Sequence, residues 1–573
     1  MVTNKYITKI ASVIMAAAVI LCLLACAFSR KLQAVYGNNA VAMEYESKLF
    51  DTDQIMDIDI LMDEDDWNDM LENAISEEYY SCDVVVNGKT FYSVGIRPKG
   101  NTSLSSIVND PDTDRYSFKL EFDHYIEGQT CYGLDKLILN NNYADATNMK
   151  EAIVYDMYQY LGVDASLYNY AKISVNGDYR GVYLALEAVE DSFMLRNYGT
   201  EDGNLYKPES MGIGGGVDGN GFPQKGEMPD GEDFPQMGEM PNGEDFPQKG
   251  EMPDGEDFPQ MGEAPNGEAA DIKMGIMGGN GGADLNYTDD DLDSYSTIWD
   301  GEITDTDKKD HKRVVEALKN ISEGTDLETY MDVDNILKYM AVHTFVVNDD
   351  SLSGTMAHNY YLYEYNGKLN ILPWDYNLSF GGMSMGGKMG GQSLGATSVI
   401  NDAIDTPFSI TDFFDALLEN EEYLEQYHGY LNELVEKYVN GGEFEKTYER
   451  IRSQIDDLVG NDPTAFYSYE EYEEAANMLI EVVQLRAKSV SGQLAGTIPS
   501  TDEGQQQDSS NLIDGSDIDL SVMGSFSGGG GGNEGQGKDN GFAGTPQPFD
   551  AGDVFPISEE KADLQDSNQD SVK

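Results

Sequence analysis

Three short segments carry polar side chains directly beside apolar stretches that are expected to form strands or helices. They are Gly95–Ser103, Asn348–Ser351 and Pro373–Asn377. The first has the glycine spacing of a phosphate-binding P-loop, but Asn101 stands where that loop needs its lysine, so we exclude a Walker-type site. Its backbone amides, with Arg97 or Lys99, could still contact phosphate, and Lys119 on the expected strand 116–120 could reach the same space. The alternative is an ordinary surface turn.

The other two segments offer side chains that suit magnesium binding and phosphoryl transfer. Asp375 follows the expected strand 369–372 and precedes a glycine-rich loop, so it is well placed to hold Mg²⁺ with hard oxygen atoms. Asp350 is a second carboxylate that could orient an attacking hydroxyl or accept its proton, and Asn359 could complete the metal shell. Phosphoryl transfer needs this kind of positioning and charge neutralisation. The alternative is that these aspartates only cap turns.

Apolar periodicity predicts an α+β protein in which a largely antiparallel sheet with added helices precedes a mainly helical part. Strands are expected at 57–62, on both sides of Asn87-Gly88, at 93–97, 117–122 and 137–139, and on both sides of Asn176-Gly177 and Asn366-Gly367. Helices are expected at 63–76, 150–161, 309–322, 326–345, 411–438, 443–458 and 469–494.

The N-terminus has the features of a targeting segment. An apolar run from Ile10 to Phe28 lies between basic residues and is long enough to cross a bilayer as a helix. The stretch Leu23–Cys26 resembles a lipoprotein cleavage box, so the alternatives are an uncleaved anchor and a lipid attached to Cys26. We therefore assign residues 1–31 to a signal peptide or membrane anchor and residues 32–50 to a stalk.

Two segments have the composition of disordered chain. Four 12-residue copies close to F-P-Q-x-G-E-M-P-x-G-E-D run in tandem from Phe222 to Ala269, and their proline and glycine residues oppose regular helix or strand. We predict a disordered insertion over 209–285, which is either a passive spacer or a segment that binds a partner. Glycine, serine, aspartate and glutamine dominate residues 499–573, which we predict to be a disordered tail.

Charge and cysteine content exclude several classes of function. The formal net charge is -68, with 36 basic against 104 acidic residues, which argues against nucleic acid as a partner. Five scattered histidines do not suggest zinc. Cys82 and Cys131 form either one disulfide or two buried thiols. Calcium bound by the acidic stretch 51–66 is a weaker hypothesis, because that stretch lacks the spacing of an EF-hand loop.

Taken in order, the polar segments resemble the CotH family of atypical protein kinases, which is named for a spore coat protein. The resemblance covers about residues 55–495 apart from the insertion, and rests on Gly95–Ser103, Tyr116–Asp123, Leu137–Asn142, Glu151–Gly162, Val175–Glu187, Asn204–Lys207, Asn348–Ser351, His358–Tyr363, Leu372–Gly381 and Arg486–Val490. It implies a two-lobed kinase-like domain over 51–498, with an antiparallel N-terminal sheet and a helical C-terminal lobe.

The resemblance also implies roles for individual residues. Asp350 corresponds to the catalytic aspartate, Asp375 to the metal-holding aspartate and Asn359 to a second metal ligand. The implied ATP-binding residues are Lys119 at the phosphates, with Arg97 as the other candidate, and Glu187 at a hinge contact to adenine.

The function so implied is transfer of the ATP γ-phosphate, with Mg²⁺ or Mn²⁺, to serine or threonine of secreted, coat or envelope proteins outside the cytoplasm. The N-terminal segment would attach the protein to the membrane. The alternative is a non-catalytic kinase-like surface adhesin or coat scaffold. The sequence leaves the oligomeric state open.

Overall fold

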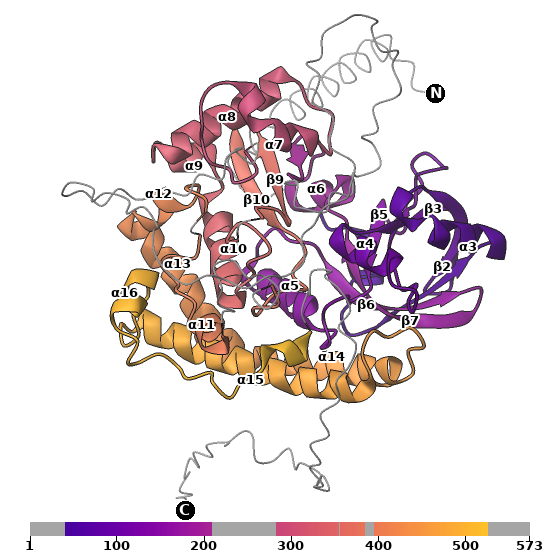
Figure 1. Ribbon diagram of the computed structural model, residues 1–573. Coiled ribbons are helices and arrows are strands. Elements are labelled where there is room, and N and C mark those ends of the chain that lie inside the picture. The colour runs from indigo at the N-terminus through magenta and orange to yellow at the C-terminus, as the bar shows by residue number, and fades with distance from the viewer. Residues whose placement is uncertain (1–40, 209–281, 355, 384–394, 409, 525–573) are drawn as a thin grey trace, which may run out of the picture. The chain divides into compact units, whose positions relative to one another are not determined.

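A computed structural model describes residues 41–208, 282–354, 356–383, 395–408 and 410–524 (Figure 1). The predicted targeting segment, the four repeats and the end of the tail lie outside these residues. The described chain is a mixed α+β structure with two sheets. Within this part of the chain, no helix has both the length and the apolar character needed to cross a membrane.

The first sheet closes into a barrel of seven strands in the order β1-β2-β3-β4-β5-β7-β6. Neighbouring strands are antiparallel except for the parallel pair of β1 with β6. The bounds are β1 Met56–Leu61, β2 Tyr80–Val86, β3 Lys89–Lys99, β4 Ser117–Glu121, β5 Lys136–Asn140, β6 Tyr168–Val175 and β7 Asp178–Glu187. The predicted Asn-Gly turns are confirmed, with left-handed φ angles of 49° at Asn87 and 52° at Asn176.

Alternation along β3 and β4 separates an apolar interior from a basic exterior. Ile96, Phe118 and Leu120 are buried inside the barrel. Arg97 and Lys99 stand on the other face of β3, and Arg97 pairs in register with Lys119 of β4. The outer face of the barrel also packs on helix α5 (Lys150–Leu161). Basic side chains and α5 therefore share one face of the barrel.

The second sheet has the order β10-β9-β8, with bounds β8 Asn204–Tyr206, β9 Tyr360–Tyr365 and β10 Lys368–Pro373. Helices α8 and α10 pack against β10. The longer helices of this part are α8 Lys308–Ser322, α10 Val333–Val346, α13 Glu421–Glu433, α14 Glu443–Gly460 and α15 Tyr469–Leu494. A π-helical turn, η3 Leu434–Val439, continues α13.

The single helix predicted at 326–345 is wrong. It is divided into α9 (Leu327–Tyr330) and α10, because Met331 is extended and bridges Leu369 of β10. The amide of Asp332 donates to the Leu369 carbonyl at 2.8 Å, and this bond holds the break in place. Pairing with the sheet therefore overrides helical propensity at this point.

Three predicted segment boundaries need correction because apolar side chains beyond them are buried. Tyr45, Leu49 and Phe50 of the expected stalk pack in the core beside the barrel. Ala283 and Leu285, at the end of the expected insertion, are 0% and 1% exposed. The folded chain also continues past residue 498 to Gly524. The folded part is thus longer at each of these edges than composition suggested.

The cysteine alternatives are resolved by the barrel. Cys82 and Cys131 are both buried as free thiols, so the disulfide is not formed. Burial raises the pKa of the Cys82 thiol to about 12, which keeps it protonated and unreactive at neutral pH.

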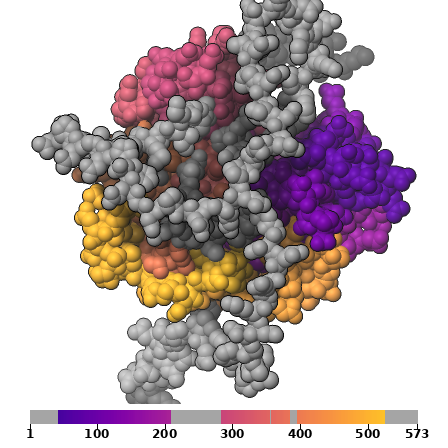
Figure 2. All heavy atoms as spheres, viewed as in Figure 1, coloured from indigo at the N-terminus to yellow at the C-terminus, as the bar shows by residue number. Residues whose placement is uncertain are grey.

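Residues 513–524 form a C-terminal strap that runs back over the helical part (yellow in Figure 1). Figure 2 shows the yellow C-terminal part of the described chain along the lower left edge of the face in view. At its start, the Ile513 amide donates to Asn401 Oδ1 at 2.9 Å. At its end, the Met523 carbonyl accepts from the Ala146 amide at 3.1 Å, in the loop before α5. Leu520 and Met523 are buried in the core between these points.

Removing residues 499–524 is expected to lower the melting temperature by several degrees. Leu520 and Met523 would leave the core, and burying one such side chain contributes roughly 1.5–3 kcal/mol. Calorimetry of a chain ended after Ile498 should be compared with one ended after Gly524. Equal melting temperatures would show that the strap adds nothing to stability.

Candidate functional site

Asp350 is held by the two residues that precede β9. Nε2 of His358 donates to Asp350 Oδ1 at 2.8 Å. Nδ2 of Asn359 donates both to the Asp350 carbonyl at 2.8 Å and to its Oδ2 at 2.9 Å. Each carboxylate oxygen keeps a second lone pair, so Asp350 can still accept a proton or a hydrogen bond from a substrate hydroxyl.

Asp375 follows β10 and is close enough to Asp350 for the two charges to interact. Burial raises the pKa of its carboxyl, the positive charge of Lys99 lowers it, and the negative charge of Asp350 raises it further. Nδ2 of Asn348 approaches the Asp375 carbonyl at 3.4 Å. The predicted strand end and aspartate loop thus meet the end of α10.

Lys99, at the end of β3, reaches the same space from the barrel. Its Nζ is 3.3 Å from Asn140 Oδ1, and Nδ2 of Asn140 donates to Glu151 Oε2 at 2.9 Å. Burial lowers the pKa of Lys99, while Asp375 and Glu151 raise it. Asn140 therefore links a barrel lysine to a glutamate on α5.

Glu151 is 4% exposed and faces the Asp375 loop, because its Oε1 lies 3.5 Å from the amide nitrogen of Tyr376. Burial raises the pKa of Glu151, the charge of Asp375 raises it further, and Lys99 opposes both. A buried carboxylate is tolerated only beside such partners. Lys99, Glu151 and Asp375 therefore form one electrostatic unit.

Left-handed backbone conformations cluster around this unit. Val347, Asn359, Asp375 and Phe380 have φ angles of 49°, 57°, 57° and 59°. Such angles are uncommon for residues other than glycine and are a marked departure for a β-branched valine. Strain of this kind concentrates at functional sites, where the surrounding structure enforces it. Here the Phe380 amide donates to the Val346 carbonyl at 2.6 Å, which ties the Asp375 loop to α10.

A series of buried side-chain hydrogen bonds supports the loop that contains Asp375. The Ser353 hydroxyl donates to the Asn348 carbonyl at 2.9 Å, so it accepts from His343 Nε2 at 2.8 Å. Nδ1 of His343 then accepts from the Tyr376 hydroxyl at 3.0 Å. These bonds define a neutral imidazole with its proton on Nε2, and burial lowers the pKa of His343 to about 3.

A profile of a protein family described as CotH kinase protein matches residues 96–490. The chain belongs to the CotH family. The match covers more than half of the chain, confirms the predicted resemblance and assigns the protein to kinase-like enzymes at the family level. Kinases generally use ATP and a divalent metal ion. No curated protein matches the chain.

The residues of this CotH protein fit a magnesium or manganese ion. Among the described residues, no three His, Cys, Asp or Glu side chains are close enough together to hold an ion by themselves. Mg²⁺, however, is usually bound by one or two carboxylates together with water and substrate phosphates. Asp375 and Asp350 supply two carboxylates, and the buried Oδ1 of Asn348 has no protein hydrogen-bond partner. That orphaned acceptor is what a cation or its water would satisfy.

The site residues predicted from sequence fall into two groups. Asp350, Asn359 and Asp375 are brought together, and Arg97 is near enough to lower the pKa of Lys99. Arg97 also forms an ion pair with Glu77. The individual roles assigned to these residues stay predictions.

Lys119 and Glu187 are engaged in other contacts. Lys119 pairs with Glu190, which is also bound by Lys136. Glu187 is 0% exposed; it accepts from the Tyr45 hydroxyl at 2.5 Å and from Arg196 Nε at 2.9 Å. The structure does not bring either residue into the Lys99–Glu151–Asp375 unit, and their predicted ATP contacts stay predictions.

The sequence left Lys99 as an option and gave no role to Glu151, Asn140 or Asn348, although each lies in a segment that carries the family resemblance. The signal for Lys99 was present, because Arg97 and Lys99 alternate with apolar Ile96 and Pro98 and so share an outer face. For Glu151 the local pattern of helix 150–161 gave no such signal. Its burial arises only when α5 packs on the barrel.

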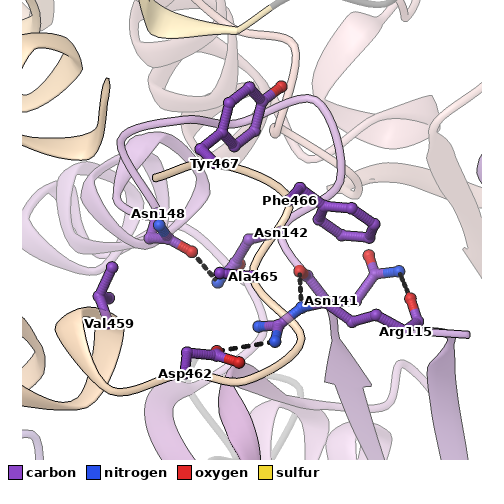
Figure 3. A pocket seen from close by; sticks show the side chains of 9 residues that line it. All are labelled: Arg115, Asn141, Asn142, Asn148, Val459, Asp462, Ala465, Phe466 and Tyr467. Atoms are coloured by element: carbon purple, nitrogen blue, oxygen red, sulfur yellow. Dashed lines mark hydrogen bonds and ion pairs between the residues drawn. The ribbon is translucent and has the colours of Figure 1, made fainter. Parts of the chain in front are cut away.

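A separate small cavity lies where the barrel meets the loop after α14 (Figure 3). Arg115 is 2% exposed there and donates to Asp462 Oδ2 at 2.7 Å, to the Asn141 carbonyl at 3.0 Å and to the Val182 carbonyl. With these bonds made, the guanidinium joins the α14 loop to two barrel segments. We therefore assign this cavity a structural role.

Replacing Lys99 by methionine is expected to weaken ATP binding about tenfold or more, because a charge-assisted contact to phosphate is lost. Lys119→Met tests the competing candidate from the neighbouring strand; because Lys119 is paired with Glu190, we expect it to leave ATP affinity within about twofold, with a stability cost of about 1 kcal/mol. Titration with a fluorescent ATP analogue and thermal melting measure both effects. The reverse pattern would identify Lys119 as the phosphate-contacting lysine.

His343 should make the protein acid-sensitive. Its pKa in the folded state is about 3, below the ordinary value of 6.5, so the unfolded chain binds the proton first as pH falls. Stability from the neutral imidazole is complete above pH 6.5 and is lost toward pH 3, by roughly 2 kcal/mol between pH 7 and pH 5. Urea unfolding of wild type and His343→Gln at both pH values measures the difference. Parallel pH dependence in the two proteins would contradict this assignment.

Proposed function

We propose that this CotH protein transfers the γ-phosphate of ATP to serine or threonine side chains of proteins outside the cytoplasm. The observation that carries the proposal is the meeting of four charged side chains from four separate elements. Lys99 comes from β3, Glu151 from α5, Asp350 from the loop after α10, and Asp375 from the end of β10. A lysine linked through Asn140 to a helical glutamate, beside one aspartate proposed to bind metal and one proposed to accept a proton, matches the inventory of a protein kinase site.

Each residue has one task in the proposed reaction. Lys99 binds the ATP phosphates, and Glu151 positions Lys99 through their mutual attraction and through Asn140. The acceptor hydroxyl oxygen forms a bond to the γ-phosphorus while the bond from that phosphorus to the bridging oxygen of ADP breaks. Asp350, oriented by His358 and Asn359, takes the hydroxyl proton.

Asp375 is the principal residue proposed to hold Mg²⁺ or Mn²⁺, with the Asn348 amide oxygen beside it and Asn359 as the further candidate from the sequence. An ion bound there supplies charge neutralisation for the phosphate oxygens. The pKa of the Asp375 carboxyl is raised by burial and by Asp350, so a cation would stabilise its ionised form.

The proposed setting is the cell or spore surface. The CotH family is associated with the spore coat, and the apolar run Ile10–Phe28 favours export and attachment to a membrane. The proposed substrates are accordingly coat, envelope or secreted proteins. An acidic chain with net charge -68 suits a solvated surface location and does not favour nucleic acid.

Phosphate transfer from labelled ATP is the direct test, with protein lacking residues 1–31 and with Mg²⁺ or Mn²⁺. Asp350→Asn and Asp375→Ala are each expected to reduce transfer at least about 100-fold, because they remove proton acceptance and metal binding. Asp178→Asn, an exposed residue of the β6–β7 turn, is the matched control and should retain full activity.

The outcomes separate the two candidate functions. Metal-dependent transfer that both site variants lose supports the kinase. No transfer together with no stabilisation of the protein by ATP would contradict it and would favour a kinase-like surface adhesin or coat scaffold. Binding of ATP without transfer to general protein substrates would direct the search to the native acceptor protein.

A further inference from the structure

We propose that Lys207 forms, together with Lys99, a two-lysine clamp that binds the phosphate chain of the nucleotide. The inference rests on the proposed kinase function and names a second cation for the same site. Lys207 directly follows β8 of the three-stranded sheet, whereas Lys99 ends β3 of the barrel. The two lysines therefore approach the site from two separate sheets.

The backbone of Lys207 is fixed at the end of β8. Tyr206, the preceding residue, pairs with Leu362 of β9. The Lys207 amide donates to the Gly301 carbonyl at 2.7 Å, and the chain packs so closely that a Cβ on Gly301 would lie 2.3 Å from the Lys207 carbonyl oxygen. Only glycine is compatible with this approach. Lys207 therefore extends from a rigid strand end rather than from a free loop.

Two adjoining aromatic rings place the lysines relative to each other. Nζ of Lys207 is 5.9 Å from the centre of the Tyr361 ring, and Nζ of Lys99 is 5.7 Å from the centre of the Trp374 ring. The two ring centres are 5.4 Å apart, with the planes at 89°. Trp374 immediately precedes Asp375, and both ammonium groups are close enough to the Asp375 carboxylate to interact with its charge. Aromatic faces stabilise cations at such distances and restrict where the flexible stems can go.

The charges around the two lysines indicate which kind of ligand they bind. Lys207 interacts favourably with Asp375 and unfavourably with Lys99, and Arg97 adds a third positive charge to Lys99. Two ammonium groups in a partly desolvated space repel each other, and an anion bound between them offsets that repulsion. Arg97 is paired with Glu77, so Lys99 and Lys207 are the two lysines that converge on Asp375, in a chain that has only 36 basic residues against 104 acidic ones. A polyphosphate chain supplies negative charge that two ammonium groups from two separate sheets can bind together.

The test is to measure binding of ATP, ADP, adenosine and inorganic tripolyphosphate, with Mg²⁺ present throughout, to wild type and variants. Lys207→Met is expected to weaken ATP and tripolyphosphate binding about ten- to hundredfold and to leave adenosine affinity unchanged. Lys207→Arg keeps the charge and should restore most of the affinity. Lys309→Met, on the exposed side of α8, is the control and should behave as wild type. Isothermal calorimetry measures affinities without relying on catalytic turnover.

Each outcome decides the proposal. Equal loss of ATP and adenosine affinity in Lys207→Met would show that Lys207 only supports the fold, and unchanged ATP affinity would show that it contacts no phosphate; either result overturns the clamp while the kinase proposal stands. Failure of the wild-type protein to bind ATP or tripolyphosphate at all would overturn both.

Discussion

The electrostatic interaction among the buried side chains of Lys99, Glu151 and Asp375 is the constraint on which the candidate site depends. Each of these groups would be costly to enclose alone, and each has its pKa displaced by burial. They are tolerated together because opposite charges and the Asn140 amide offset part of that cost. The elements that carry them must therefore keep a fixed spacing: the barrel supplies Lys99, α5 supplies Glu151 and the second sheet supplies Asp375.

Much of the surrounding structure serves to keep that spacing. The Asp375 loop is bound to the end of α10 through the Phe380 amide and supported below by the chain from Tyr376 through His343 to Ser353. The loop before α5 is bound by the end of the C-terminal strap. Four left-handed residues around the site show that this rigidity is achieved against local backbone preference. A site whose charges must meet within a few ångströms benefits from such rigid support, since small displacements of reacting groups lower rates strongly.

Other buried charged groups in the chain differ from this unit because each has a set of close protein partners. Glu187 is bound by Tyr45, Arg196 and the Leu167 amide, and Arg115 is bound by Asp462 and two carbonyls. In both cases the charged group has several close protein partners, and breaking such a set is strongly destabilising. The candidate site instead combines repelling carboxylates, repelling lysines and an unsatisfied Asn348 oxygen. Incomplete satisfaction of that kind is characteristic of a place that receives a ligand.

The sequence by itself determined the local helices and strands, and it also revealed the polar residues that lie at the ends of β9, β10 and α10. Asn-Gly turns, strand alternation and helical periodicity depend on neighbours in the chain, which is why β1, β2, β4–β7, the β9–β10 hairpin and α5, α8, α14 and α15 agree with prediction. The strand predicted after Asn87-Gly88 and the one predicted at 93–97 are instead a single strand, β3. Asp350, Asn359 and Asp375 were identifiable because each interrupts an apolar pattern. Only tertiary structure decided that the sheet closes into a barrel, that Met331 breaks a helix by pairing with β10, and that Lys99 and Glu151 lie beside Asp375. These outcomes depend on contacts between residues far apart in sequence, and no local pattern of residue types encodes the distance between a lysine on one sheet and a carboxylate that follows another.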